Sequence, residues 1–260
     1  MVGAGLSGLA AAVELAGRAE VQVIERLPAA GGIWGFEHAQ VRRLVAECGS
    51  KDVKLILGVT ALRWCDERLF VLGPDHAAWL RGKQLVFAGG TRPSHAAELR
   101  VAGPRLAGVF VATVAHHLLG AGIRLGRHTV VTGWGDWVEV VVPHLLEHGE
   151  VTLVGGESQD RLPWPQARWW PGYRPRRLLG EARVEGIEVS CGEKVQRLRC
   201  DSVIFAGELK ALRNVDGANR DSAERAIFIQ PTSVGMDSTA VIDHARVAAA
   251  ELRLPWEDRA

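Results

Sequence analysis

Short apolar runs alternate with glycine-containing turns and helical patterns along most of the chain. Residues 9–16 form an apolar helical run, residues 21–24 an apolar strand, and residues 84–90 a buried strand that ends in glycines. The same patterns predict further strands at 54–64, 68–72, 182–189, 195–200 and 226–229, and helices at 37–47 and 239–252. Strands that alternate with helices in this way predict an α/β fold.

The first glycine turn, residues 3–8, has the spacing GxGxxG. A helix and a strand follow it, and Glu25 ends that strand, about 20 residues on, as in dinucleotide-binding folds. Gly3 permits the tight turn, Gly5 lets backbone N–H groups approach a pyrophosphate, and Gly8 lets the helix pack closely. Glu25 would accept hydrogen bonds from an adenosine ribose. A glycine-rich turn without a ligand is the alternative.

The chain has an unusually short strand before this turn. Only Met1 and Val2 precede Gly3, whereas a strand is typically about five residues long. We therefore expect a natural form to begin several residues upstream of Met1. The apolar start is broken by glycines and lacks a basic leader, which argues against a secretory signal.

The order of strand, glycine turn, helix and strand repeats from residue 129, with glycines at Gly133 and Gly135. The repeat predicts two Rossmann-like dinucleotide-binding units in one α/β chain. The first unit is expected to be discontinuous, with a trimmed second unit inserted in it. The expected boundaries are 1–118 with 208–260 for the first unit and 119–207 for the second.

The second glycine turn is degenerate. Val138 stands where the third Gly or Ala belongs, and Trp134 crowds the approach of a pyrophosphate. The strand after it ends in two glycines, with no adjacent acid for a ribose. We therefore expect at best weak binding of NAD(H) at Gly133 and Gly135, or glycines kept for packing alone.

Composition and charge exclude several classes of protein. The 260 residues are 47% hydrophobic and 23% charged, which excludes a disordered chain. The net charge of +1 gives no general attraction to nucleic acid or an acidic membrane, and no apolar run reaches the roughly 18 residues of a membrane span. Asn occurs only twice, which fits a thermophile.

Four cysteines stand too far apart to form a CxxC pair: Cys48, Cys65, Cys191 and Cys200. This spacing argues against a zinc ribbon, an iron–sulfur site and a thioredoxin-like dithiol. It is typical of a reduced, cytoplasmic protein, and no metal site is expected.

Further motifs follow the first glycine turn in a characteristic order: GGIW at 31–34, LVFAGGTRP at 85–93, the second GxG unit and DSVIFAGE at 201–208. In this order the chain resembles the thioredoxin-reductase-like pyridine-nucleotide oxidoreductases, which are flavoproteins with two dinucleotide folds. Residues 106–135 are most similar to the branch without a redox disulfide. That branch includes the FAD subunits of dye-linked proline dehydrogenase and hydrogen cyanide synthase, and reductases associated with glycerol-3-phosphate metabolism.

The resemblance implies an FAD-dependent oxidoreductase without a redox disulfide. Its flavin would pass electrons to a partner subunit or an external acceptor. The adenine end of FAD would lie at Glu25, and the pyrophosphate across Gly5 and the helix start at Leu6. The other positions implied to contact a cofactor are Gly3, Ser7, Gly8, Arg26, Gly32, Trp34, Ala61, Gly89, Gly90 and Thr232, with Gly133 and Gly135 in the second unit.

The chain departs from the family near its end, where the family has a Gly-Asp pair that binds the flavin ribityl chain. Residues 229–232 read Ile-Gln-Pro-Thr here, and Thr232 is the residue expected to bond a hydroxyl. No catalytic acid or base is identified. A non-catalytic assembly subunit of a dehydrogenase complex is one alternative. A thiazole-synthase-like enzyme, suggested by the GGIWG turn, is disfavoured by the second glycine unit.

Three other clusters have competing interpretations. His144, Glu147 and His148 match HxxEH, an inverted zinc-protease motif, but they end a predicted helix, where histidine complements the helix dipole and a zinc site is disfavoured. His116 and His117 are expected in a crossover, with one histidine outside, and an acid–base role beside the flavin is the alternative. Residues 160–177 are rich in Trp, Pro and Arg, and no regular structure is predicted for them. We expect 164–177 to dock another oxidoreductase subunit or a second copy, with packing over the core as the alternative and no nucleic acid as partner.

Overall fold

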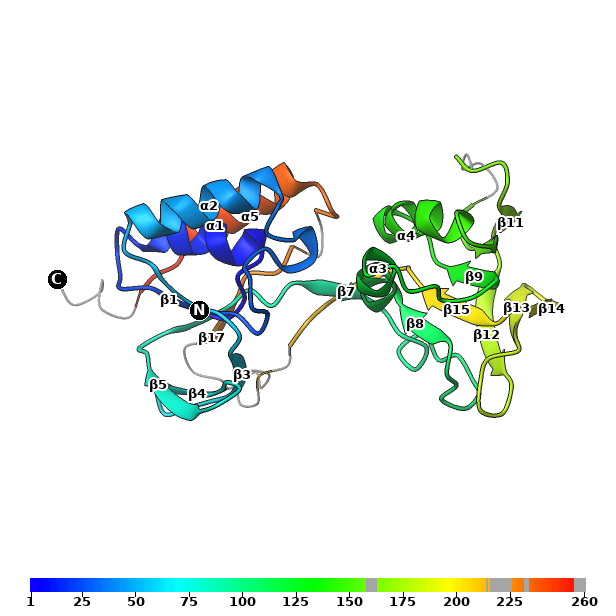
Figure 1. Cartoon of the computed structure of the whole chain (residues 1–260), viewed down its shortest axis with the longest axis horizontal. Coiled ribbons are helices and arrows are strands. Elements are labelled where there is room, and N and C mark those ends of the chain that lie inside the picture. Colours follow the sequence, from blue (N-terminus) through cyan, green and yellow to red (C-terminus); the bar gives the residue numbers. More distant parts are fainter. Residues whose placement is uncertain (158–162, 214, 216–225, 232–233, 255–260) are drawn as a thin grey trace. The chain divides into compact units, whose positions relative to one another are not determined.

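The computed structural model describes residues 1–157, 163–213, 215, 226–231 and 234–254. The chain forms two compact units, Met1–Thr91 with Ala211–Ala260, and Arg92–Lys210 (Figure 1). The second unit is thus inserted into the first. The strands at which the chain passes between the units, β7 (Thr91–Pro93) and β16 (Leu209–Ala211), pair with each other.

The first unit is built on a parallel sheet. β1 (Gln22–Ile24) pairs with β2 (Lys54–Ile56), and β6 (Leu85–Phe87) pairs with β17 (Ala226–Phe228). Val2 bridges both Ile24 and Phe87, so the start of the chain is the central position of the sheet. Successive parallel segments connected through helices are the hallmark of a Rossmann-like unit.

Two layers cover this sheet. The helices α1 (Leu6–Leu15), α2 (Ala39–Ser50) and α5 (Ser238–Ala250) lie together on one face, and the antiparallel strands β3 (Thr60–Cys65), β4 (Arg68–Leu72) and β5 (Ala77–Arg81) lie on the other (Figure 1). The small side chains Ala10, Ala11 and Ala12 are fully buried in the core on the helical side. A second core, around Trp64 and Leu69, fills the side of the antiparallel strands.

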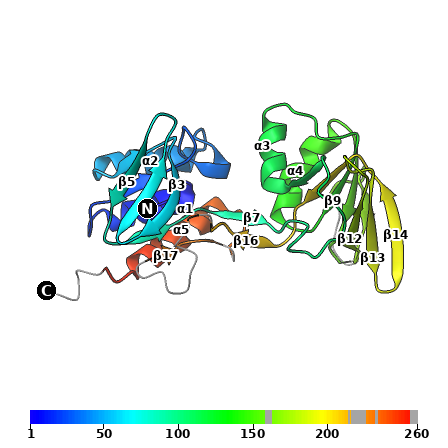
Figure 2. The same cartoon turned by 90° about the horizontal axis from the view of Figure 1, so that it is seen from below.

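The second unit repeats this plan. Its parallel sheet has the order β11 (Arg168–Trp170), β10 (Glu150–Val154), β9 (His128–Thr132), β15 (Ser202–Phe205) and β8 (Val109–Val111). The helices α3 (Ala112–Gly120) and α4 (Asp136–Leu146) accompany it. The antiparallel strands β12 (Arg174–Leu179), β13 (Gly186–Cys191) and β14 (Lys194–Arg199) form a separate layer (Figure 2).

The α/β prediction is confirmed, but the structure changes several boundaries. The first boundary lies at residue 91 instead of 118, because β8 pairs in parallel with β15 and α3 follows it directly. The second lies at 210 instead of 207. The strand expected over 54–64 is two strands in different sheets, because Gly58 turns the chain with φ 70°.

The stretch 160–177 was wrongly predicted to lack regular structure. β11 lies in it and β12 begins in it, because they are stabilised by pairing with β10 and β13 rather than by their own composition. Residues 158–162 and Thr232 lie outside the described residues. Within the part that the structure describes, no helix has the length and apolar character needed to cross a membrane.

Candidate functional site

The first glycine turn joins the central position of the sheet to α1, and two of its glycines are required by close backbone contacts. Gly3 has φ 101°, and a Cβ on it would lie 2.3 Å from the carbonyl oxygen of Ala88. A Cβ on Gly8 would lie 1.9 Å from the carbonyl oxygen of Gly3. Both glycines therefore serve the packing of the turn against the sheet, whether or not a ligand is bound.

Gly5 is different, because nothing in the protein explains its lack of a side chain. Its φ of −75° is open to any residue, and an added Cβ would meet no atom within 4 Å. Gly5 is the N-cap of α1, no side chain caps that helix end, and the first turn contains no acidic residue. The N-terminal N–H groups of a helix favour an anion. Open space in front of this helix end fits a pyrophosphate, and a Cβ would fill it.

Glu25 lies beside this turn with its carboxylate held in place. The residue is 6% exposed, its Oε2 accepts a hydrogen bond of 2.8 Å from the Ala4 N–H, and its Oε1 accepts one of 2.9 Å from the Leu27 N–H. A carboxylate has about four acceptor positions, so each oxygen keeps capacity for a hydroxyl donor. Arg26, the next residue, is exposed. The geometry fits the role predicted for Glu25 at a ribose.

A second glycine segment, residues 31–35, packs against the first glycine turn. The Gly31 N–H donates to the Ala4 carbonyl oxygen at 2.7 Å, and Gly31 bridges Gly5. A Cβ on Gly32 would lie 3.4 Å from the Cα of Gly5. Trp34 ends the short 3-10 helix Gly32–Trp34, with its ring centroid 5.2 Å from that of His38. The predicted residues Gly32 and Trp34 thus belong to a segment that contacts the first turn.

The carboxyl ends of β6 and β17 meet at a further polar group that sequence reasoning missed. The Gln230 Nε2 donates to the carbonyl oxygens of Gly90, at 3.2 Å, and Leu212. These two bonds orient the amide and leave Gln230 Oε1 buried, with no hydrogen-bond partner among the described residues. A buried acceptor without a partner is costly. A ligand hydroxyl would satisfy it.

The signal for Gln230 was present in the sequence, as a polar residue directly after the apolar run 226–229. Of the neighbouring predictions, Gly90 takes part in this contact, and Gly89 packs against the ring of Phe87. Ala61 is 5% exposed and lies in the core around Trp64. Its side chain packs inside the protein.

The second glycine turn has the backbone of a nucleotide turn but different surroundings. Gly133 has φ 122°, and its Cβ would lie 2.4 Å from the Gly207 nitrogen, whereas a Cβ on Gly135 would meet nothing within 4 Å. The first turn of α4 carries Asp136 and Glu139. Carboxylates at a helix N-terminus compete with an anion for its dipole and N–H groups, so this turn is less suited to a pyrophosphate than the first.

Aromatic residues lie in the second glycine turn and in and just after β11. The rings of Trp134 and Trp169 stack, with centroids 5.5 Å apart and an interplanar angle of 24°. Trp169 Nε1 donates to the carbonyl oxygen of Gly155 at 2.9 Å. Trp170 and Tyr173 meet edge to face at 5.0 Å and pack against the core of the second unit. Part of the aromatic stretch therefore folds back onto its own unit, as the packing alternative describes.

The histidine clusters show no catalytic or metal-binding arrangement. His144 Nδ1 lies 3.9 Å from the Glu147 carboxylate, and both side chains are exposed near the end of α4. His116 and His117 lie on α3 with ring centroids 5.7 Å apart, and His117 is exposed. No three His, Cys, Asp or Glu side chains gather as metal ligands within the described ranges.

All four cysteines are free thiols. Burial raises the pKa of Cys48 to about 11 and that of Cys200 to about 12, with smaller contributions from neighbouring carboxylates. Thiols with such high pKa values stay protonated at neutral pH and are poor nucleophiles.

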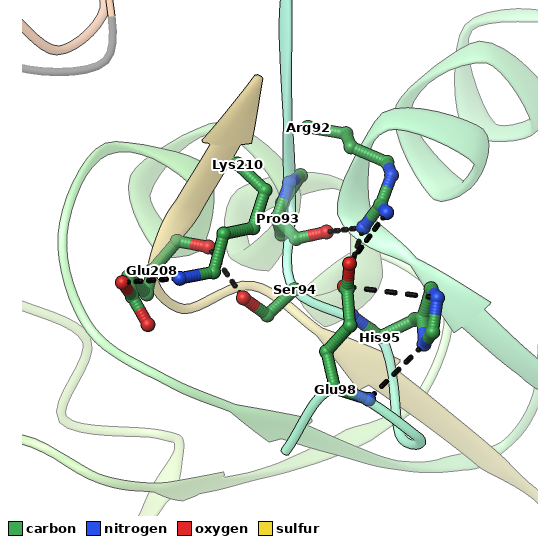
Figure 3. Close-up of polar contacts among 7 residues, drawn as sticks. All are labelled: Arg92, Pro93, Ser94, His95, Glu98, Glu208 and Lys210. Carbon is green, nitrogen blue, oxygen red and sulfur yellow. Dashed lines mark hydrogen bonds and ion pairs between the residues drawn. The ribbon is translucent and has the colours of Figure 1, made fainter. Parts of the chain in front are cut away.

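A dense polar cluster lies where the chain enters and leaves the second unit (Figure 3). Arg92 forms two hydrogen bonds to Glu98, of 2.7 and 2.8 Å, and the His95 N–H donates to the same carboxylate. The Arg92 hydrogen bond lowers the pKa of Glu98 to about 2. Ser94 donates from its N–H and hydroxyl to the Glu208 carbonyl oxygen. The Ser94 bonds fasten the two chain segments together, whereas the contacts of Arg92 and Glu98 lie within one segment.

Comparison with known proteins supports the two-unit architecture. Residues 1–51 match the family model of the NAD(P)-binding Rossmann-like domain. No curated protein matches the sequence. The L-proline dehydrogenase of P. horikoshii is a similar solved structure (TM-score 0.60, 18% identity), and the alignment covers 96% of this chain and 53% of that chain. This chain thus spans about half of that relative.

Two further solved structures have the same fold. The thioredoxin reductase of T. acidophilum aligns with a TM-score of 0.60 and 17% identity over 96% of this chain and 95% of that chain. A pyridine nucleotide-disulfide family oxidoreductase from Enterococcus faecalis V583 aligns with a TM-score of 0.65 and 16% identity, over 96% and 67% of the two chains. The chain therefore has the fold of the oxidoreductases with two dinucleotide-binding domains, and its first unit is Rossmann-like.

Proposed function

We propose that the protein is an FAD-dependent oxidoreductase whose first unit holds the cofactor. The observation that carries this proposal is the open space at Gly5, which lies in front of the uncapped start of α1 and beside the fixed carboxylate of Glu25. Unlike Gly3 and Gly8, Gly5 has no close backbone contact that would require a glycine. A dinucleotide needs both the open space and the carboxylate, because its pyrophosphate and its ribose bind a few ångströms apart.

Each residue has a distinct part in this binding. The backbone N–H groups at the start of α1, from Leu6 and Ser7, would donate to the pyrophosphate oxygens. Glu25 would accept from the ribose hydroxyls of the adenosine. The unpartnered Gln230 Oε1, at the end of β17, would accept from a hydroxyl farther along the cofactor, where FAD carries its ribityl chain. Bound FAD supplies hydride and electron transfer.

The buried Gln230 Oε1 offers an acceptor for a cofactor hydroxyl in the first unit. It replaces the aspartate that the resemblance led us to expect, and it takes the role first assigned to Thr232, which lies outside the described residues. An amide oxygen accepts the same hydrogen bond without a charge.

We propose that the flavin passes its electrons to a partner subunit or an external acceptor rather than to a disulfide of this chain. The free cysteines support this, and two of them, Cys48 and Cys200, are buried with raised pKa values. The second unit would bind NAD(H) weakly at Gly133 and Gly135, because Asp136 and the Trp134 ring stand at that turn.

The test begins with the visible spectrum of the purified full chain, followed by equilibrium dialysis of the apoprotein with FAD. A yellow protein that binds FAD stoichiometrically and transfers electrons to a dye supports the proposal. A colourless protein that takes up no FAD contradicts it and favours the non-catalytic assembly subunit. Replacement of Gln230 by Met should weaken FAD binding, since it removes the acceptor proposed for a cofactor hydroxyl.

A further inference from the structure

The antiparallel sheet of the second unit has one buried face and one exposed face. Leu178, Ile187 and Val189 are buried in the core of the unit, so their sides of β12 and β13 face inward. Side chains alternate along a strand, and residues paired across strands share a face. The register therefore assigns the residues between these positions to the outer face of the β12–β13–β14 layer (Figure 2).

Arginines dominate that outer face. Arg177 pairs with Glu188, which pairs in turn with Arg197, so the three form one row across the sheet. Arg174 and Arg199 belong to the rows on either side, paired with Ser190 and Gly186. We call these five charged residues the arginine face. Four arginines less one glutamate leave a formal charge of +3 here, against +1 for the whole chain.

The arginines are available to a partner. The Arg197 side chain is 75% exposed, although its Nε donates to Glu188 at 2.9 Å, whereas the Glu188 side chain is only 14% exposed. Arg174, Arg177 and Arg199 are also exposed. The acids Glu185 and Glu193 stand next to the two ends of β13. At the centre of the arginine face, the Glu188 carboxylate is largely covered and the surrounding guanidinium groups are exposed.

Protection of a sheet edge explains only part of this pattern. Charged side chains on an edge strand prevent pairing with other chains, and β14 is an edge strand of this layer. Arg177 lies on β12, however, where the outer edge of the strand is already occupied from Arg176 to Leu178. The Ala102 N–H donates to the Arg176 carbonyl oxygen, and the Leu178 N–H donates to that of Ala102, both at 2.8 Å. Arg177 thus needs another explanation.

We propose that the arginine face docks an acidic segment of a partner protein. Guanidinium groups two strand spacings apart, about 10 Å, suit separate carboxylates, each of which an arginine can bind with two hydrogen bonds. A second copy of this chain is disfavoured because two faces of +3 repel each other.

Nucleic acid is disfavoured by the arrangement of the aromatic rings of the second unit. The rings that would stack on bases are engaged within the unit, Trp169 with Trp134 and Trp170 with Tyr173. We therefore propose that the partner expected at 164–177 contacts the arginines of β12 and β14 rather than these aromatic rings.

The test uses the full-length chain and a fluorescein-labelled oligoglutamate peptide as the probe, with fluorescence anisotropy as the readout. It needs no cofactor, so its outcome is separate from that of the flavin proposal. The double substitution R177Q/R199Q should weaken binding about tenfold at low salt, since each exposed pair contributes about threefold. The control R81Q/R124Q removes the same charge from exposed arginines elsewhere and should change binding less than about twofold.

A substitution in the central row should change the affinity for oligoglutamate in the opposite direction. E188Q should tighten binding of oligoglutamate, because it removes the only carboxylate of the arginine face. Absence of binding, or an equal loss in R177Q/R199Q and R81Q/R124Q, would overturn the proposal. Tighter binding of an oligothymidylate of equal charge, or of phosphatidylserine vesicles, that is lost in R177Q/R199Q would also overturn it, in favour of nucleic acid or a membrane surface.

Discussion

Methyl groups added at Gly5, Gly8 and Gly17 should separate ligand binding from folding at the first helix. Gly5 precedes α1 and Gly17 follows it, and a Cβ on either meets no atom within 4 Å. Gly5→Ala replaces a glycine N-cap, which lowers the free energy of unfolding by about 0.5–1 kcal/mol. It also restricts the unfolded chain, which raises that free energy by about 0.4–1 kcal/mol. The free energy of unfolding of the apoprotein should therefore stay nearly unchanged.

The same methyl group should strongly weaken cofactor binding. It occupies the space in front of the helix start and pushes the pyrophosphate away from the N–H groups there. Loss of one hydrogen bond to a charged group costs about 1.5–3 kcal/mol, which corresponds to roughly 10- to 100-fold in the Kd for FAD. Gly17→Ala should raise the free energy of unfolding by about 0.4–1 kcal/mol and leave the Kd for FAD within about twofold, because Gly17 lies at the other end of α1.

Gly8→Ala provides the contrast. Its Cβ would lie 1.9 Å from the Gly3 carbonyl oxygen, which is backbone and cannot rotate away. Overpacking of this kind costs about 3 kcal/mol or more, equivalent to a Tm lower by about 6–12 °C. Thermal unfolding of the three apoproteins and FAD titration by equilibrium dialysis measure the two effects. If Gly5→Ala retains FAD like Gly17→Ala, the assignment of the pyrophosphate to Gly5 is refuted.

Three further predictions concern other parts of the molecule. Glu25→Gln should weaken FAD binding by about 1–3 kcal/mol, measured by the same dialysis, and unchanged retention would contradict its role at the ribose. The pKa of Glu98 is lowered to about 2 by Arg92, so this carboxylate stabilises the fold fully above its ordinary pKa of 4.5. That contribution is lost as the pH falls from 4.5 towards 2, and Glu98→Gln should flatten the Tm profile in this window. Calorimetry should detect at best weak NADH binding in the second unit, tightened by Asp136→Asn, whereas tight binding by the unmodified protein would be inconsistent with the repulsion described.

The sequence by itself determined the first glycine turn and its acid. Gly3, Gly5, Gly8 and Glu25 belong to one continuous strand–helix–strand segment, and the geometry of such a segment follows from local helix and turn preferences. The spacing therefore predicted their neighbourhood, and the roles of Gly3 and Gly8 in close packing agree with the distances found. The repeated pattern likewise predicted two Rossmann-like units.

Only the tertiary structure decided the features that join distant parts of the chain. Gln230 follows an apolar run, but its contact with the Gly90 carbonyl oxygen spans 140 residues, so the local pattern could not show which group it contacts. β8 belongs to the second unit because its partner strand is β15, far along the chain, which moved the boundary from 118 to 91. β11 and β12 form within a Trp- and Pro-rich stretch because neighbouring strands pair with them. Strand pairing and side-chain burial act between remote residues, so neither could be inferred from the residues of one segment.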